Sequence, residues 1–190
     1  MNTEDLSKKM LTVEDCEKLD LKEVRKLYKN YVNPGLENIL YSFGAGEIIA
    51  DHAEGVWIHT KDGRKILDVS GGIGVLTLGH NHPRILAARI KYQQQKRMEV
   101  HKTLFSPYQA ALSHNLAQLL PGDLDYPFFC NSGAEAVEGA MKVAYKYHEG
   151  KRKHILHANI SFHGKLLGSG GMTNVQEKCF KFPTVPGIKS

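Results

Sequence analysis

One stretch, PFFCNSGAEAVEGAMKVAYKYHEG at residues 127–150, constrains the fold of this chain more than any other. The apolar run over 126–130 is typical of a buried strand, and apolar side chains then recur at helical spacing over 134–148. A second strand-like run follows over 154–160. The three elements predict a βαβ unit with parallel strands and a right-handed crossover, so residues 131–134 lie where the first strand hands over to the helix.

The small polar turn at this junction is suited to an anion. Backbone amides in the first turn of a helix lack intrahelical partners and lie at the positive end of the macrodipole. Gly133 allows a ligand to approach the backbone, and the Ser132 hydroxyl adds a donor. The same letters are equally typical of simple helix capping, in which Asn131 or Ser132 caps the helix and Glu135 completes a capping box. Both interpretations use the same amides, and both remain open from these residues alone.

A second feature follows the second predicted strand, in the letters SFHG. An aromatic side chain at the carboxyl end of a strand, beside a helix terminus that holds a phosphate, is placed to stack on a flat ring attached to that phosphate. Phe162 is the candidate, with His163 beside it. By spacing alone Phe162 is also consistent with a core phenylalanine, and His163 with an ordinary loop histidine.

Upstream, the pattern predicts mainly helices around one small antiparallel unit. Residues 1–35 read as a helical arm whose last run ends at Asn33-Pro34-Gly35. A hairpin with an Asp62-Gly63 turn and a glycine-rich loop come next. One helix is then expected with Pro83 in its first turn, and another from Ser106-Pro107 to Pro121-Gly122.

Composition and charge exclude several classes of function. The chain has 25 Lys and Arg against 20 Asp and Glu, a net charge of +5, but the basic residues are dispersed, which argues against a nucleic-acid surface. No apolar run approaches the roughly 20 residues of a membrane span, and the amino terminus lacks the apolar core of a signal peptide, so a cytoplasmic protein without membrane contact is expected. Cys16, Cys130 and Cys179 fit neither a disulfide framework nor a zinc knuckle.

The histidines leave one further alternative, a metal site. His80 and His82 lie close in sequence, and His101 or His59 would supply a further ligand. The nearby glutamates are not spaced as in metallohydrolases, and His82-Pro83 is explained more simply as the entry to a helix. No metal is therefore predicted.

Taken together, these stretches resemble the class III aminotransferases, which are pyridoxal phosphate (PLP) enzymes of fold type I. The resemblance rests on NSGAEAVEGAMKVAYKY followed by a strand and SFHGK, with LDVSGGIGVLTLGHNHP upstream, and it covers most of the chain from about Val32 onward. Within the family, YVNPG and YPFFCNSGAEAVE are most similar to the putrescine (diamine) branch. The chain also resembles, more distantly, the ornithine, acetylornithine and 4-aminobutyrate aminotransferases of the same family.

The resemblance implies an α/β fold, namely the amino-terminal segment and the first βαβ unit of the large mixed-sheet domain of a fold type I PLP-transferase. The implied organisation is a helical arm over 1–35, a small-domain segment over 36–122 and the start of the PLP-binding domain over 123–190. It also implies transfer of an amino group from a primary amine, such as a diamine or an ω-amino acid, to a 2-oxo acid. A homodimer is expected for the full-length enzyme.

Roles carry over only where residues match. Ser132, Gly133 and Ala134 stand at the family's phosphate-binding turn, which agrees with the argument from the helix terminus. Phe162 matches the aromatic residue that stacks on the PLP ring, and His163 its neighbour in the cofactor pocket.

Two other matches concern the substrate side of the family's site. Residues 71–74 and 78–83 match a loop near the family's substrate entrance and dimer interface. Lys165 stands where acetylornithine and ornithine relatives carry an Arg that pairs with a substrate carboxylate. A Lys lacks the bidentate fork of Arg, which favours a diamine or another amino donor.

In the family, the Lys that forms the Schiff base and the acid that pairs with the pyridinium nitrogen both lie well downstream of the FHG motif. No Asp follows Asp125 here, and no Lys stands in a matching context, so no residue is assigned as catalytic. We therefore expect an amino-terminal fragment of a longer enzyme that is inactive alone. The alternative is a non-catalytic subunit that binds a phosphate or cofactor and pairs with a separate chain.

Overall fold

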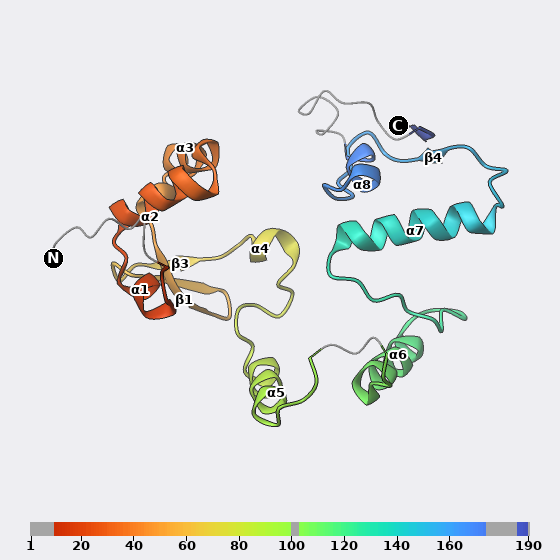
Figure 1. Cartoon of the computed structure of the whole chain (residues 1–190), viewed down its shortest axis with the longest axis horizontal. Helices are drawn as coiled ribbons and strands as arrows, with labels where there is room; N and C mark the ends of the chain where they lie inside the picture. The colour runs from red at the N-terminus through yellow and green to blue at the C-terminus, as the bar shows by residue number, and fades with distance from the viewer. Residues whose placement is uncertain (1–9, 100–102, 174–185, 190) are drawn as a thin grey trace. The chain divides into compact units, whose positions relative to one another are not determined.

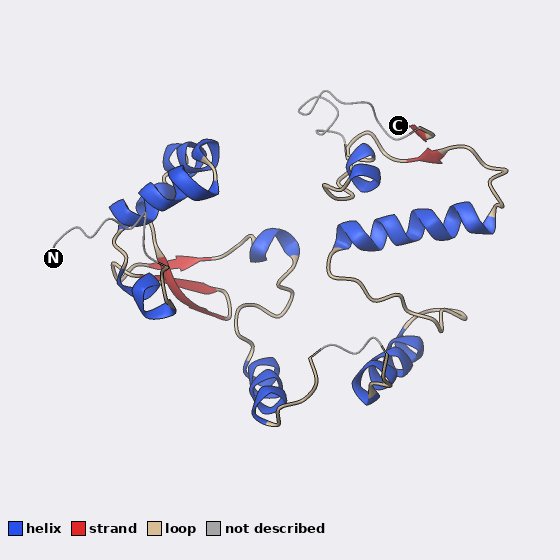
Figure 2. Ribbon diagram, in the orientation of Figure 1, coloured by secondary structure: helices blue, strands red, loops and turns tan. Residues whose placement is uncertain are grey.

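The structure is a computed structural model that describes residues 10–99, 103–173 and 186–189. The chain divides into two compact units, Met1–Glu99 and Val100–Ser190 (Figures 1 and 2). Within the described residues, no helix is both long enough and apolar enough to cross a bilayer.

The first unit combines an arm of short helices with a small antiparallel sheet (Figure 2). Its helices are α1 (Val13–Lys18), α2 (Leu21–Leu27), the π-helix η2 (Tyr28–Val32), α3 (Pro34–Ser42), the 3-10 helix η3 (Ala45–Glu47), α4 (Gly71–Gly74) and α5 (Pro83–Gln94). Its strands are β1 (Ala50–Glu54), β2 (Trp57–Thr60) and β3 (Lys65–Leu67), paired in that order. The helical run expected to end at Asn33 and the helix starting at Pro83 are confirmed, while residues 1–9 of the predicted arm lie outside the described residues.

Local capping determines where the arm helices begin and end. The helical run does end at Asn33, as predicted, but Pro34 immediately opens α3, with the Asn33 side chain accepting a hydrogen bond from the Leu36 amide at 3.0 Å. The Arg25 guanidinium from α2 bonds the buried Glu37 carboxylate of α3 at 2.7 Å and lies 4.2 Å from the centre of the Tyr41 ring. These contacts hold α2 against α3.

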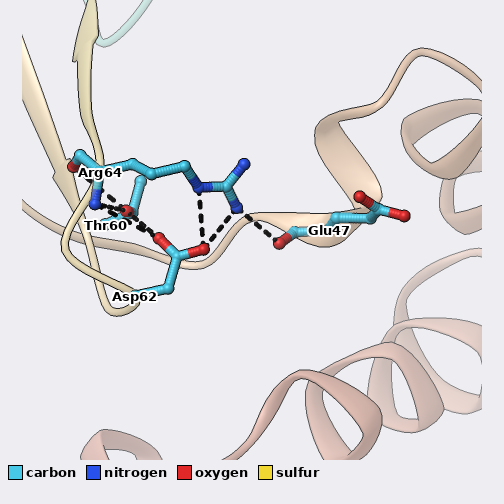
Figure 3. Close-up of polar contacts among 4 residues, drawn as sticks. All are labelled: Glu47, Thr60, Asp62 and Arg64. Atoms are coloured by element: carbon cyan, nitrogen blue, oxygen red, sulfur yellow. Dashed lines mark hydrogen bonds and ion pairs between the residues drawn. The ribbon is translucent and has the colours of Figure 1, made fainter.

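The predicted hairpin is confirmed, and its turn is closed by a polar network (Figure 3). Gly63 has φ +84°, which glycine adopts without steric cost. The Thr60 hydroxyl accepts from the Arg64 amide at 2.9 Å and donates to Asp62, whose carboxylate bonds the Arg64 guanidinium at 2.8 Å. The Arg64 bond is the main reason that the pKa of Asp62 lies well below its usual range. Arg64 also donates to the Glu47 carbonyl at 3.1 Å, joining the turn to η3.

The glycine-rich loop after β3 is closed at its base by one carboxylate. Asp68 Oδ1 accepts from the Ser70 amide and hydroxyl and from the Gly71 amide at 2.8–2.9 Å, and its Oδ2 lies 2.8 Å from His80 Nε2. The hydrogen bond from His80 is the largest cause that lowers the pKa of Asp68 to about 2. His80 also exchanges two backbone hydrogen bonds with Gly55, which lies between β1 and β2, so the far end of the loop is anchored to the small sheet.

The second unit is mainly helical, with one short parallel strand pair. Its elements are α6 (Pro107–Leu119), α7 (Gly133–Tyr147), β4 (Ile155–Leu156), α8 (Leu167–Gly171) and β5 (Ile188–Lys189). The helix from Ser106-Pro107 and the helix over 134–148 are both confirmed, and Ser106 caps the former through the Gln109 amide at 3.2 Å.

The predicted strand over 126–130 is wrong for this structure, because that segment has no regular secondary structure. A strand needs a neighbour for its backbone hydrogen bonds, and nothing in the described residues pairs with this one. Its apolar side chains are accordingly open, with Tyr126 97% and Phe128 71% exposed. The second strand is reduced to β4, which pairs in parallel with β5 through Ile155 and Ile188 rather than with residues 126–130.

The densest packing in the second unit lies between α7 and the segment around α8. Met141 and Met172 are the buried apolar side chains within the described ranges, at 8% and 4% exposure. The Phe128 ring lies against Gly139 of α7, so closely that a Cβ there would stand 2.9 Å from a ring carbon. Helix α7 therefore has one side packed on α8 and another that carries the preceding aromatic segment.

Candidate functional site

The turn at the start of α7 is organised by Ser132 and Glu135. The Ser132 hydroxyl accepts a hydrogen bond from the Glu135 amide at 3.2 Å, which confirms Ser132 as the N-cap. The predicted capping box is only half formed, because the Glu135 carboxylate accepts from the Asn131 amide at 2.6 Å rather than from the amide of Ser132. The carboxylate thereby holds the chain that enters the turn.

This capped turn still presents donors to a ligand. The amides of Gly133 and Ala134 have no acceptor in the part of the chain that the structure describes, as expected for the first turn of a helix. A Cβ built on Gly133 would meet no atom within 4 Å, so the space beside the turn is open. The Ser132 hydroxyl hydrogen is not used by the capping bond, in which its oxygen is the acceptor. A phosphate fits these three donors and this open space.

The second predicted element, the loop over 161–164, carries an exposed aromatic ring. Phe162 is 69% exposed, so it is not a core residue of this unit. His163 is partly buried, and its ring meets the edge of the His157 ring at a centroid distance of 6.4 Å. An exposed ring on a well-packed loop is available to a flat ligand.

The structure brings the two predicted elements into contact through Gly164 and Ala134. A Cβ built on Gly164 would stand 2.5 Å from Ala134 Cβ and 2.9 Å from Ala134 Cα, and Gly164 has φ +129°. Glycine is required there both for its conformation and for the close approach of the loop to the first turn of α7. Ser132, Gly133 and Ala134 therefore lie on the turn against which the loop carrying Phe162 and His163 is packed.

The loop is held by residues that the sequence reasoning missed. The Thr173 hydroxyl accepts from the His163 amide at 2.9 Å, and the Glu138 carboxylate of α7 accepts from the Ser169 amide at 2.7 Å. The role of Glu138 could have been suspected from the sequence, because it lies one helical turn after Glu135. The role of Thr173 could not, because nothing in its neighbours in sequence indicates a partner ten residues earlier.

The two predictions for the substrate side, Lys165 and the loop over 71–74 and 78–83, fall in different units of the chain. Lys165 is exposed, follows Gly164 directly, and forms no ion pair with a described residue. The loop over 71–74 and 78–83 belongs to the first unit, where Asp68 and His80 close its base. The turn of α7 belongs to the second unit.

A groove of about 1340 Å³ runs along α7 beside the candidate site. Its lining is largely apolar and begins at the segment before the helix. The residues include Phe128, Phe129, Val143, Tyr147, Leu166 and Leu167. The groove is lined by Asn131 and Glu135 of the capped turn but not by Ser132 or Gly133, so it borders the turn without including its free amides.

The histidines proposed as an alternative metal site have other surroundings. His80 Nε2 is bonded to Asp68, and His59 stacks on His52 with ring centroids 4.4 Å apart. His101 lies outside the described residues. Among residues 10–99, 103–173 and 186–189, no three His, Cys, Asp or Glu side chains are grouped so as to hold a metal ion.

Known proteins match both the sequence and the fold. The family profile described as Aminotransferase class-III matches residues 41–188. An (S)-enantioselective omega-transaminase from Thermomicrobium roseum is 30% identical with a TM-score of 0.73, over 90% of this chain and 39% of that one. A PMP-bound aminotransferase from Vibrio fluvialis is 28% identical with a TM-score of 0.71, over 85% of this chain and 37% of that one.

A third solved structure extends the similarity to an archaeal enzyme. The adenosylmethionine-8-amino-7-oxononanoate aminotransferase of Methanocaldococcus jannaschii is 26% identical with a TM-score of 0.74, over 89% of this chain and 40% of that one. This chain thus spans about two fifths of the length of the solved structures that it matches. The match to these structures confirms the predicted α/β fold of fold type I.

Proposed function

This chain belongs to the class III aminotransferase family, whose members use pyridoxal phosphate, and on that premise we propose that it is the amino-terminal part of a PLP-dependent transaminase. The observation that carries the proposal is the contact of Gly164 with Ala134. It places an exposed aromatic ring on a loop packed against a helix terminus that has unused amide donors. A cofactor with a phosphate and a flat ring fits both features.

Each described residue has a physical role in this proposal. The amides of Gly133 and Ala134 and the Ser132 hydroxyl would hold the phosphate dianion, which would also gain from the positive end of the α7 dipole. Phe162 would stack on the ring and exclude water from it, with His163 beside it in the cofactor pocket. Bound PLP would supply the electron sink that stabilises a carbanion at the substrate carbon.

The whole enzyme would transfer an amino group from a primary amine to a 2-oxo acid. A diamine such as putrescine, or an ω-amino acid, is the proposed donor, because Lys165 replaces the Arg that binds an α-carboxylate in the ornithine and acetylornithine branches. The Schiff-base Lys and the acid for the pyridinium nitrogen are proposed to lie outside these 190 residues. A cytoplasmic homodimer, and the division at residues 35 and 122, belong to the same proposal.

The cofactor site is tested with a ligand that cannot react with lysines. Pyridoxine 5′-phosphate keeps the phosphate and the ring of PLP but has no aldehyde, so its binding reports the site alone. We expect it to bind the chain, and inorganic phosphate to compete. Phe162→Ala should weaken pyridoxine 5′-phosphate by about tenfold, as expected for the loss of a stacking contact of ~1 kcal/mol or more. Phosphate affinity should stay unchanged.

The control is Phe105→Ala, which removes a fully exposed phenylalanine of the same unit. It should leave both affinities unchanged. Thermal unfolding of both variants should differ little from the wild type, since neither ring is buried. If Phe162→Ala lowered stability as much as it lowered affinity, Phe162 would be a packing residue and the proposed stacking would be refuted.

Transaminase activity is tested on the native polypeptide. Its intact mass, detected in source cells through a peptide over 128–142, shows whether it exceeds 21.2 kDa. A longer product should convert putrescine and a 2-oxo acid. A native product of 21.2 kDa that binds pyridoxine 5′-phosphate without activity would instead favour the non-catalytic partner subunit.

A further inference from the structure

We propose that Thr173 is a positioning residue for the cofactor, in an inference that rests on the proposed function. Its hydroxyl fixes the backbone of His163 and Gly164, and through it the position of Phe162 on the loop that packs against the first turn of α7. Within the described residues, the hydrogen-bond partners of its hydroxyl are His163, Gly164 and Ser169, none of them in the turn at residues 132–134, and Thr173 is 5% exposed.

The hydrogen bonds of Thr173 converge on the loop that carries the ring. Its Oγ1 accepts from the His163 amide at 2.9 Å, and it lies 3.0 Å from the Gly164 carbonyl and 3.2 Å from the Ser169 carbonyl. A hydroxyl has one hydrogen and two lone pairs, so it can accept from His163 while it donates to one of the two carbonyls. A threonine at this position therefore satisfies the His163 amide of the loop and one carbonyl, of Gly164 or of Ser169, in a buried place.

A second contact ties Thr173 back to α7. Leu166, at the N-cap of α8, has no side chain that could cap the helix, and the Glu138 carboxylate of α7 takes this role by accepting from the Ser169 amide at 2.7 Å. A Cβ on Gly168 would stand 2.7 Å from Glu138 Oε2, so glycine leaves room for the carboxylate. Thr173 comes directly after Met172, the C-cap of α8, so Glu138 helps to fix the position from which Thr173 reaches the loop.

These contacts form a closed path from α7 through α8 to the loop and back to α7 at Ala134. The Phe162 side chain is 69% exposed, so its packing contributes little to holding the loop in place. The backbone is held on both sides of Phe162. On the amino side the Ser161 hydroxyl lies 2.6 Å from the Ala158 carbonyl and 2.8 Å from the Met172 carbonyl, and on the carboxyl side Thr173 and the contact of Gly164 with Ala134 hold the loop. The phosphate turn lies on α7 itself, so it does not depend on Thr173.

The test compares Thr173→Val, which keeps the branched shape and removes the hydroxyl, with Thr173→Ser, which restores the hydroxyl. Thr103→Val is the control, since Thr103 is an exposed threonine of the same unit. The full 190-residue chain is titrated with pyridoxine 5′-phosphate and, separately, with inorganic phosphate. Amide hydrogen exchange at His163 is measured in the same samples without ligand.

We expect Thr173→Val to raise the dissociation constant of pyridoxine 5′-phosphate about tenfold, the size expected when a buried hydrogen bond is lost. The constant for inorganic phosphate should change less than about twofold, because the α7 turn is intact. Exchange protection of the His163 amide should be lost. Thr173→Ser should restore protection and ring affinity, and Thr103→Val should match the wild type.

Four outcomes overturn the inference, and they separate it from the proposed function. Equal loss of phosphate and pyridoxine 5′-phosphate in Thr173→Val would make Thr173 a folding residue, and so would failure of Thr173→Ser to restore ring affinity. If Thr173→Val loses exchange protection of the His163 amide but binds pyridoxine 5′-phosphate as tightly as the wild type, the positioning role alone is refuted. A wild-type chain that binds neither ligand would refute the proposed cofactor site, and the positioning role with it.

Discussion

Replacement of Gly164 by alanine tests the contact that joins the two parts of the candidate site. The new Cβ would stand 2.5 Å from Ala134 Cβ and 2.8 Å from Ser169 Oγ, which is closer than real Cβ contacts allow. The backbone at φ +129° also lies in a region that non-glycine residues rarely adopt. Overpacking costs about 1–3 kcal/mol and a strained backbone conformation about 1–3 kcal/mol more.

The sum, about 2–6 kcal/mol, is a large part of the roughly 5–15 kcal/mol that stabilises a folded domain. Urea unfolding followed by far-UV circular dichroism, with amide exchange at α7, measures the loss in the second unit. Trp57 is the chain's single tryptophan and lies on β2 in the first unit, so its fluorescence provides an internal reference. The urea midpoint of the first unit, followed by Trp57 fluorescence, should be the same in Gly164→Ala and in the wild type.

Gly133→Ala is the matched control, with the same chemical change on α7 itself. Its Cβ would meet no atom within 4 Å, and alanine is the better helix former by about 1 kcal/mol, so this variant should be slightly more stable. The same methyl group enters the open space beside the turn, so phosphate affinity should fall. If Gly164→Ala were as stable as the wild type, the contact between the loop and α7 would not exist in solution, and the reasoning on the site would be refuted.

Three further predictions concern single polar groups. Ser132→Ala should destabilise α7 by ~1 kcal/mol and weaken phosphate binding, both measured on one sample by urea unfolding and calorimetry, whereas unchanged affinity would exclude the hydroxyl as a ligand donor. Because the pKa of Asp68 is lowered to about 2, its contribution is complete above the unfolded value near 4 and is lost as pH falls toward 2. Amide protection of the loop over 70–79 should fall in that window for the wild type but not for Asp68→Asn, and parallel profiles would contradict this. Arg25→Ala leaves the buried Glu37 carboxylate without its partner and should cost about 2 kcal/mol in the unfolding of the first unit, while Lys26→Ala should cost nothing measurable.

Elements whose hydrogen bonds are satisfied locally could be predicted from the sequence. Helix α7, its Ser132 cap and the hairpin closed by Gly63 all follow from residues within four positions of one another. The first sheet nevertheless has a strand that the pattern did not reveal, β1 (Ala50–Glu54), because its letters do not alternate between apolar and polar. The amino-terminal turn of α7 was likewise recognisable because capping residues and orphan amides are a local property.

The residues 126–130 show the limit of such reasoning, because an apolar run predicts a strand only if a neighbour is present to pair with it. The sequence by itself determined that a capped helix terminus and an aromatic loop would exist in this chain. Only the tertiary structure decided that Gly164 packs the loop on Ala134, and that Thr173 and Glu138 hold it there. The physical reason is distance along the chain: these partners lie 10 to 31 residues apart, and packing rather than local propensity brings them together.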